Sequence, residues 1–279
     1  MPAKFAYVDG TAVHYVYRGR TTLPGVVPDF GKGELLVFLH DAGGNAGLFQ
    51  RVMPLLDQHS TLAFDFPAHG RSGGTTGLES IEACTSFFAS LVRAMGLRPA
   101  VLIGHGMGAA VALRVACAYP ETIRALVLVA AVAQFDVSRD VLDTWRSVMH
   151  GRMPQPFTTD GFSPKTDFAV MREAWGEQVK TDPRVRYSDL VACAGHDSGV
   201  DLSRITAPAL LVSGNDDRLA TSAGAAQLQA RIGGAKLVTI ADAGHMLALE
   251  KPSELAAEIK TFLSDLSDKS DNSDTSDKP

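Results

Sequence analysis

The hydrophobic positions of the chain gather into short apolar runs of strand length, most of them separated by longer segments of helical character. The first two runs, residues 5–8 and 12–17, flank Asp9-Gly10. This dipeptide suits a tight hairpin turn, because both central positions of the turn need positive φ. Six further runs have the length and apolarity of buried strands, and they cover residues 35–39, 61–64, 100–103, 125–130, 209–212 and 236–240.

The segments of helical character cover residues 78–95, 109–119, 222–232 and 252–266. Strands that alternate with helices predict a mainly parallel sheet with a layer of helices on each face. We therefore expect an α/β fold built on a mainly parallel, doubly covered, eight-stranded sheet that begins with an antiparallel hairpin.

The alternation stops between residues 130 and 209, in a stretch that holds many aromatic residues. An insertion of this length predicts a small helical cap over the carboxyl edge of the sheet. Trp145, Trp175 and Phe135 are candidate substrate-binding residues in this stretch. Packing of the cap against the core is the more common role of any one such aromatic residue, so the hypothesis of substrate contact applies to the group.

The last residues of the chain are rich in Ser and Asp and poor in apolar residues. This composition predicts a disordered tail, because such a segment buries too little apolar surface to offset the entropy of ordering. The expected organisation is a first core part at 1–133, a cap insertion at 134–200, a second core part at 201–266 and the tail at 267–279.

Composition and charge narrow the classes of partner. The 279 residues are 46% hydrophobic and carry a net charge of −5 without a run of Lys or Arg, so neither nucleic acid nor a membrane is an expected partner. The start of the sequence lacks the features of a signal peptide, and no apolar run approaches the about 18 residues that a membrane span needs. We expect a cytoplasmic protein with a small neutral or apolar ligand, and the oligomeric state is left open.

The three cysteines, Cys84, Cys117 and Cys193, are scattered along the chain without C-x-x-C spacing. We expect reduced thiols, because an odd, scattered set suggests neither a disulfide framework nor a zinc site. No spacing of His, Asp and Glu suggests a metal site, and we expect no metal, nucleotide or flavin cofactor.

The segment VLIGHGMGAAVAL joins an apolar strand to a helix through a glycine-rich turn. It fits the dinucleotide fingerprint G-x-G-x-x-G/A through Gly104, Gly106 and Ala109, and it fits the nucleophile elbow G-x-S-x-G with Gly106 in place of serine. A dinucleotide site also needs an acidic residue at the end of the next strand to hold the ribose. That strand ends in alanines and a valine, so a dinucleotide-binding protein is the weaker hypothesis.

Further segments accompany the turn in an order that favours the elbow. HDAGG and DFPAHGRS follow two successive strands, while Asp217 and His245 follow the last two. Together these segments resemble the α/β-hydrolase superfamily, in its capped single-domain branch of esterases, lactonases, C–C bond hydrolases, haloperoxidases and related proteins. The resemblance covers residues 5–266, nearly the whole chain, and it implies the α/β-hydrolase fold.

The resemblance also implies roles for individual residues. Asp217 would be the acid and His245 the base of a catalytic triad, in which an aspartate orients the histidine and stabilises its charged form. The backbone N–H groups of Ala42 and Met107 would form the oxyanion hole.

For several of these assignments the sequence offers an alternative residue or role. Asp216 is an alternative partner for His245, and Asp136 is an alternative acid because some members of the superfamily carry theirs after the same strand. Asp217 has a purely structural alternative, as a cap of the next helix. We expect His40 and His105 to support their loops rather than take part in chemistry.

The sequence departs from the superfamily at two positions. Gly106 stands where a Ser, Cys or Asp nucleophile is expected, and Asp41 stands in a loop where glycine is common. A carboxylate at position 41 would oppose the charge of an oxyanion if it pointed into the site, and the sequence leaves its direction open. Glycine at the elbow removes a backbone strain of about 1–3 kcal/mol, which favours glycine in a lineage that no longer needs the nucleophile.

Two functional hypotheses follow. In the first, a protein of hydrolase ancestry acts on a small apolar ester, lactone or related carbonyl compound, and His245 activates water or the substrate in the space left by the serine side chain. In the second, the protein is a non-catalytic, ligand-binding pseudoenzyme. Because only the hydroxyl is missing, Gly106→Ser is expected to create a serine hydrolase if the rest of the site is intact.

Overall fold

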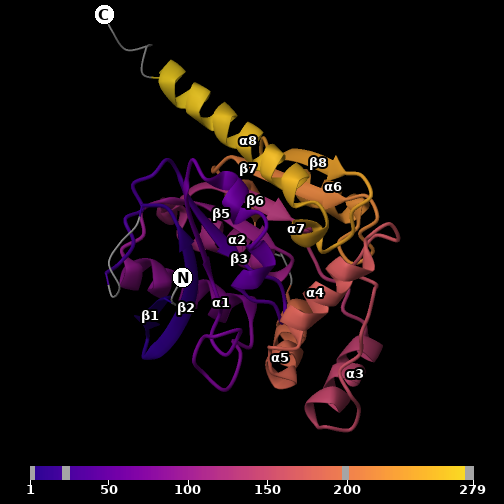
Figure 1. Cartoon of the computed structure of the whole chain (residues 1–279). Helices are drawn as coiled ribbons and strands as arrows, with labels where there is room; N and C mark the ends of the chain where they lie inside the picture. Colours follow the sequence, from indigo (N-terminus) through magenta and orange to yellow (C-terminus); the bar gives the residue numbers. More distant parts are fainter. Residues whose placement is uncertain (1–3, 21–25, 197–200, 274–279) are drawn as a thin grey trace, which may run out of the picture.

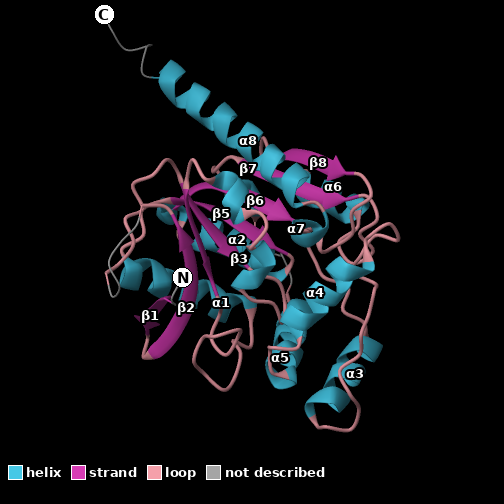
Figure 2. Cartoon of the chain, in the orientation of Figure 1, coloured by secondary structure: helices cyan, strands magenta, loops and turns pink. Residues whose placement is uncertain are grey.

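The computed structural model describes residues 4–20, 26–196 and 201–273, and an eight-stranded sheet forms its centre (Figures 1 and 2). β1 pairs antiparallel with β2 and β2 with β4, and the other neighbours are parallel. The expected mainly parallel sheet is therefore confirmed. In spatial order the strands are β1 (Lys4–Val8), β2 (Thr11–Arg18), β4 (Ser60–Phe64), β3 (Leu35–Leu39), β5 (Ala100–His105), β6 (Ile123–Val129), β7 (Ala209–Gly214) and β8 (Lys236–Ile240).

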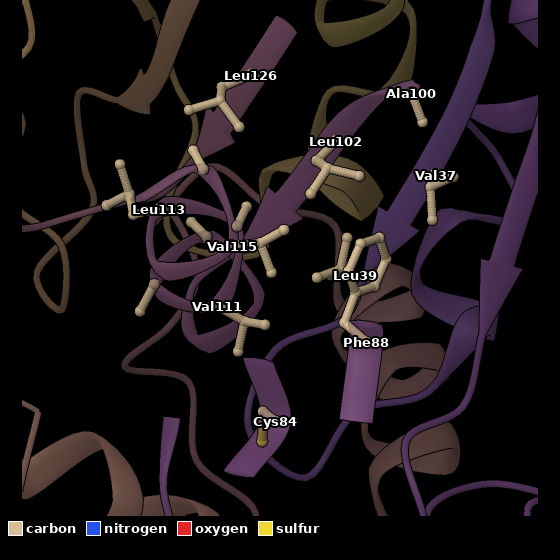
Figure 3. Packing of buried hydrophobic residues seen from close by; sticks show 14 of the residues in the cluster. Val37, Leu39, Cys84, Phe88, Ala100, Leu102, Val111, Leu113, Val115 and Leu126 are labelled. Carbon is tan, nitrogen blue, oxygen red and sulfur yellow. The ribbon is translucent and has the colours of Figure 1, made fainter. Parts of the chain in front are cut away.

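Both faces of the sheet are covered, because alternate residues of its central strands are apolar on both sides. Val37 and Leu39 of β3 belong to one buried cluster (Figure 3), whereas Leu36 and Phe38 belong to another. The first cluster includes residues of α1 (Ile81–Met95) and α2 (Met107–Ala118). The second includes residues of the 3-10 helices η1 (Ala46–Phe49) and η2 (Met53–Leu56) and of the helices α7 (Leu247–Glu250) and α8 (Pro252–Ser273).

Three helices form most of the insertion between β6 and β7: α3 (Arg139–Met149), α4 (Phe168–Gln178) and α5 (Pro183–Ala194). At the start of each helix a backbone N–H donates a hydrogen bond to the side chain of the capping residue, which is Ser138, Asp167 and Asp182 respectively. This is the usual way in which a helix start is satisfied. The last residues of the expected cap, 197–200, lie outside the described residues. The short 3-10 helix η4 (Leu202–Arg204) then leads into β7, and α6 (Ser222–Gln229) separates β7 from β8.

Helix α8 corrects one boundary. It continues to Ser273 and projects away from the sheet (Figure 1), so the first part of the segment 267–279 is helical rather than disordered. Buried apolar residues such as Leu255 and Leu263 anchor the start of this helix. Extension of an anchored helix costs little compared with its nucleation, so the polar continuation adopts the same conformation. Residues 274–279 lie outside the described residues.

Two further features concern the cysteines and the hydrophobicity of the helices. The three cysteines are free. Within the described ranges, no helix is both long enough and apolar enough to cross a membrane.

Candidate functional site

Gly106 occupies the sharp turn between β5 and α2, with φ +52° and ψ −114°. A positive φ of this size favours glycine over any residue with a Cβ. The turn is also closely packed, because a Cβ at Gly104 would lie 2.3 Å from the carbonyl oxygen of Gly108. A strand, a strained residue and a helix start, in this order, form the geometry of a nucleophile elbow.

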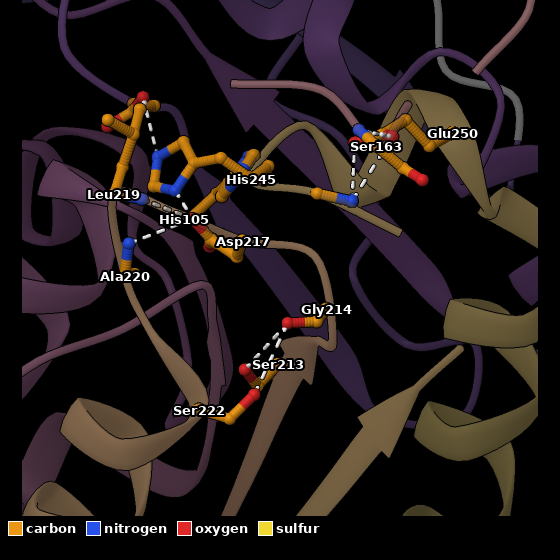
Figure 4. A network of polar contacts seen from close by, with 12 residues as sticks. His105, Ser163, Ser213, Gly214, Asp217, Leu219, Ala220, Ser222, His245 and Glu250 are labelled. Atoms are coloured by element: carbon orange, nitrogen blue, oxygen red, sulfur yellow. Dashed lines mark hydrogen bonds and ion pairs between the residues drawn. The ribbon is translucent and has the colours of Figure 1, made fainter. Parts of the chain in front are cut away.

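His245 and Asp217 meet at the carboxyl edge of the sheet (Figure 4). Nδ1 of His245 lies 3.0 Å from Oδ2 of Asp217. The other carboxylate oxygen of Asp217 accepts hydrogen bonds of 2.8 Å from the N–H groups of Leu219 and Ala220. The expected hydrogen bond between histidine and acid is present, and Asp217 also stabilises the loop that follows it.

The two alternative acids lie elsewhere. Asp216 accepts a hydrogen bond of 2.5 Å from the hydroxyl of Ser163. Asp136 is exposed and lines a separate open cleft of about 680 Å³. Among the described contacts of His245, none involves either residue.

Two residues hold the backbone around His245. Both carboxylate oxygens of Glu250 lie 3.1 Å from the N–H of Gly244, and Nε2 of His105 lies 2.6 Å from the carbonyl oxygen of His245. Burial and the charge of His245 lower the pKa of His105 to about 4, so His105 is neutral and its Nε2–H donates to that carbonyl. His105 therefore supports a loop, whereas nothing in the local sequence pattern pointed to Glu250.

Asp41 points into the site. Its Oδ1 accepts a hydrogen bond of 2.8 Å from the N–H of Met107, and its Oδ2 lies 3.3 Å from Nε2 of His245. A Cβ on Gly106 would lie only 2.1 Å from Oδ1 of Asp41. The carboxylate therefore fills the space that a side chain at the elbow would need.

Asp41 also changes the two amides that the sequence suggested as oxyanion donors. The N–H of Met107 is already bound by Asp41. Within the described part of the chain, no group accepts a hydrogen bond from the N–H of Ala42. In this arrangement, therefore, only the N–H of Ala42 is available to a ligand.

The charges of Asp41, Asp217 and His245 follow from the contacts of His245. Both ring nitrogens face a carboxylate, and an ionised carboxylate only accepts hydrogen bonds, so both nitrogens carry a proton. Burial by itself lowers the pKa of His245, but the hydrogen bonds to Asp217 and Asp41 raise it to about 10. Burial by itself raises the pKa of Asp41, but the hydrogen bond to His245 and its charge lower it well below the usual value. At neutral pH, an imidazolium stands between two carboxylates.

The loop that carries Asp41 is held by His40. Nδ1 of His40 lies 2.8 Å from the carbonyl oxygen of Asp41, and its Nε2 accepts a hydrogen bond of 3.1 Å from the N–H of Phe66. Burial and the charge of His69 lower the pKa of His40 to about 4. The ring is therefore neutral with its proton on Nδ1, a supporting role that matches the sequence-based expectation.

A buried ion pair joins the cap to the same loop. Oδ2 of Asp189, on α5, lies 2.7 Å from Nε2 of His69 and accepts a hydrogen bond of 2.7 Å from the N–H of Gly43. Nδ1 of His69 lies 3.0 Å from the carbonyl oxygen of Pro67, so both ring nitrogens face acceptors. Burial by itself lowers the pKa of His69, but the charge of Asp189 raises it above its usual value. The sequence singled out the loop that contains His69 but gave no signal for Asp189.

The three candidate aromatic residues occupy different places. Trp145 is buried with the guanidinium of Arg186 4.5 Å from its ring centroid. Trp175 packs against Phe157 with ring centroids 6.1 Å apart, and Phe135 lines the open cleft next to Asp136. Their contact with a substrate stays a prediction.

A small cavity of about 30 Å³ adjoins Asp41 and Ala42, between their loop, α4 and Met246. Its volume is that of about one water molecule. Among the described residues, no group of three or more His, Cys, Asp or Glu could hold a metal ion.

Comparisons with known proteins agree with this fold. The profile of the alpha/beta hydrolase family matches residues 36–258. The chain is 26% identical to a dihydrolipoyllysine-residue acetyltransferase component of the acetoin cleaving system from Cupriavidus necator, over 93% of this chain and 68% of that protein. It is 27% identical to a pyrrolizixenacetamide deacetylase from Xenorhabdus hominickii, over 84% of this chain and 92% of that protein.

Among solved structures, the enol-lactonase from Burkholderia xenovorans superposes with a TM-score of 0.81 at 23% identity. The match covers 93% of this chain and 99% of that one. At this level of identity the likeness concerns the fold alone.

Proposed function

The chain belongs to the alpha/beta hydrolase family, and we propose that it hydrolyses a small ester, lactone or related carbonyl compound without a serine nucleophile. In this proposal water is the nucleophile, and the carboxylate of Asp41 is the base that activates it. The observation that carries it is the position of Asp41, whose carboxylate fills the space beside Gly106 and contacts Nε2 of His245 at 3.3 Å. The name of one similar protein, a deacetylase, supports an acyl compound as the substrate class.

The chemistry divides between a base and an acid. Asp41 accepts a proton from a water molecule that attacks the carbonyl carbon, and the His245 imidazolium donates a proton to the leaving oxygen as its bond to carbon breaks. The proton on Asp41 then passes to His245 across their 3.3 Å contact, which restores the carboxylate and the imidazolium. Asp217 keeps the ring oriented, and the free N–H of Ala42 is available to the carbonyl oxygen as its negative charge develops.

The pKa values set an expectation for the rate. A carboxylate whose pKa is lowered, as that of Asp41 is, is a weak base at neutral pH. We therefore expect slow turnover that does not involve an acyl-serine intermediate.

Asp41→Asn tests the proposal, because it keeps the size of the side chain and removes the base. The parent should hydrolyse at least one member of a panel of short acyl esters, thioesters and lactones, and Asp41→Asn should lower that rate at least tenfold. Asp143→Asn, on the exposed part of α3, is the matched control and should leave the rate unchanged. A parent that hydrolyses none of the panel, or an Asp41→Asn variant with the parent's rate, would overturn the proposal.

A specific observation also favours the second candidate, a non-catalytic ligand-binding protein. The N–H of Met107, one of the two candidate oxyanion donors, is already occupied by Asp41. This candidate predicts that small apolar carbonyl compounds change the tryptophan fluorescence of the parent without being turned over. NAD and ATP serve as negative controls, and saturable binding of NAD would favour the dinucleotide hypothesis instead.

A further inference from the structure

Arg186 extends from α5 across the loop that carries Asp41. A Cβ on Gly43, two residues from Asp41, would lie 2.8 Å from Cγ and 3.1 Å from Nη1 of Arg186. Gly43 has φ +66° and leaves the space in which this side chain lies. The guanidinium carbon lies 4.5 Å from the centroid of the Trp145 ring, so the charged group is enclosed between the cap and the site.

Two of the three nitrogens of the guanidinium lack hydrogen-bond partners among the described residues. Nε and Nη1 of Arg186 are buried and have no partner within the described part of the chain. Trp145 offers a cation–π contact but no hydrogen-bond acceptor. An enclosed charge without hydrogen bonds is costly, so a protein seldom keeps one that has no use.

The nearby carboxylates do not satisfy Arg186. The charges of Asp41 and Asp189 both act on it, but among the described ion pairs neither residue is joined to it. Asp41 binds Met107 and His245, whereas Asp189 binds His69 and Gly43. The N–H groups at Nε and Nη1 of Arg186 therefore stay unpaired beside the loop that carries Asp41.

We propose that Arg186 binds an anionic group of the substrate, so that the substrate is a carboxylate-bearing ester or lactone with an otherwise apolar body. A guanidinium with free N–H groups is well suited to the oxygens of a carboxylate. The inference rests on the proposed function for the location and reaction of the site. It refines the expectation of a neutral or apolar ligand by adding one negative charge at the end that faces α5.

Binding of non-hydrolysable diacids tests the anion site directly. Succinate, glutarate and adipate are titrated into the parent by calorimetry and by tryptophan fluorescence, to which Trp145 contributes. At least one diacid should bind, and Arg186→Met should raise its Kd at least tenfold. Arg184→Met is the matched control, because Arg184 lies on the same helix and pairs with Asp182 on the surface, and it should leave the Kd unchanged.

Two further variants keep the test decisive if Arg186→Met does not fold. Arg186→Lys keeps the charge but loses the planar fork, and its Kd should be higher than that of the parent. Asp41→Asn removes a negative charge near the ligand and should lower the Kd. Failure of all three diacids to bind, or equal binding by the parent and the Arg186 variants, would overturn the inference.

Kinetics separate this inference from the proposed function. Monomethyl succinate, glutarate and adipate are compared with methyl butyrate and methyl valerate, and kcat/KM should be at least tenfold higher for one of the monoanions. Arg186→Met should remove that preference by lowering kcat/KM for the monoanions at least tenfold, whereas Arg184→Met should keep it. Equal hydrolysis of charged and neutral esters would refute the anion site alone, whereas diacid binding through Arg186 without hydrolysis of any ester would refute the proposed function alone.

Discussion

The carboxylate of Asp41 occupies the space beside Gly106 that any side chain at the elbow would fill, since a Cβ there would lie 2.1 Å from Oδ1 of Asp41. The two departures from the family pattern are therefore physically linked. Glycine at the elbow makes room for the carboxylate, and the carboxylate replaces the missing group as the partner of His245.

The position of Asp41 beside Gly106 changes the expected result of the substitution Gly106→Ser. Gly106→Ser alone should not give a labelled serine hydrolase, because its side chain would collide with Asp41. Asp41→Gly combined with Gly106→Ser removes the collision, frees the Met107 N–H and lowers the pKa of His245 toward that of a base. The double variant should react with a fluorophosphonate and hydrolyse short p-nitrophenyl esters.

Two comparisons check that result. Addition of His245→Ala to the double variant should abolish both labelling and hydrolysis. Labelling of the single Gly106→Ser variant as fast as the double variant would show that Asp41 does not block the elbow.

The raised pKa of His245 predicts loss of stability on the alkaline side. The folded protein holds this proton up to a pKa of about 10, whereas the unfolded chain releases it near 6.5. The stabilisation is therefore complete below pH 6.5 and is lost as the pH rises through 10. The urea midpoint of the parent should fall across this window, and that of His245→Gln should fall less. Parallel pH profiles of the two proteins would contradict the raised pKa.

Asp189 should contribute strongly to the stability of the cap. Asp189→Asn leaves His69 charged and buried without its counter-ion, because both side chains are 1% exposed. Removal of one partner of a buried ion pair costs about 3–5 kcal/mol. The free energy of unfolding, measured in urea, should fall by about this amount, whereas Asp143→Asn in an exposed pair should leave it nearly unchanged. A small effect of Asp189→Asn would mean that His69 is neutral in the folded protein.

His105 should act on catalysis through the position of His245. His105→Phe removes the donor to the carbonyl of His245 and leaves a buried acceptor unsatisfied, at a cost of about 1–3 kcal/mol of stability. We expect kcat to fall at least tenfold with little change in KM. His105→Gln keeps a donor and should recover part of the loss, whereas equal kcat values for the two variants would argue against this positioning role.

The sequence alone determined the alternation of strands and helices in the core. The buried strand β3 is a continuous apolar run and begins and ends at the expected residues. The edge strand β8 does so as well, although Lys236 and Thr239 in it are exposed. Asp9-Gly10 marked the hairpin turn. The elbow was equally local, because its glycines lie at alternate positions within a few residues of the chain. Helix α8 was placed correctly at its start but not at its end, since polar composition does not show how far an anchored helix extends.

The tertiary structure decided which side chains meet. Asp41 and His245 are separated by 204 positions in the chain, and Asp189 reaches His69 and Gly43 from the cap insertion, whose sequence carries no family motif. The direction of Asp41, the occupied amide of Met107 and the enclosed charge of Arg186 depend on loops packed against one another. Local periodicity reports only on neighbours along the chain, so contacts of this kind become visible only after the sheet has brought its carboxyl edge and the cap together.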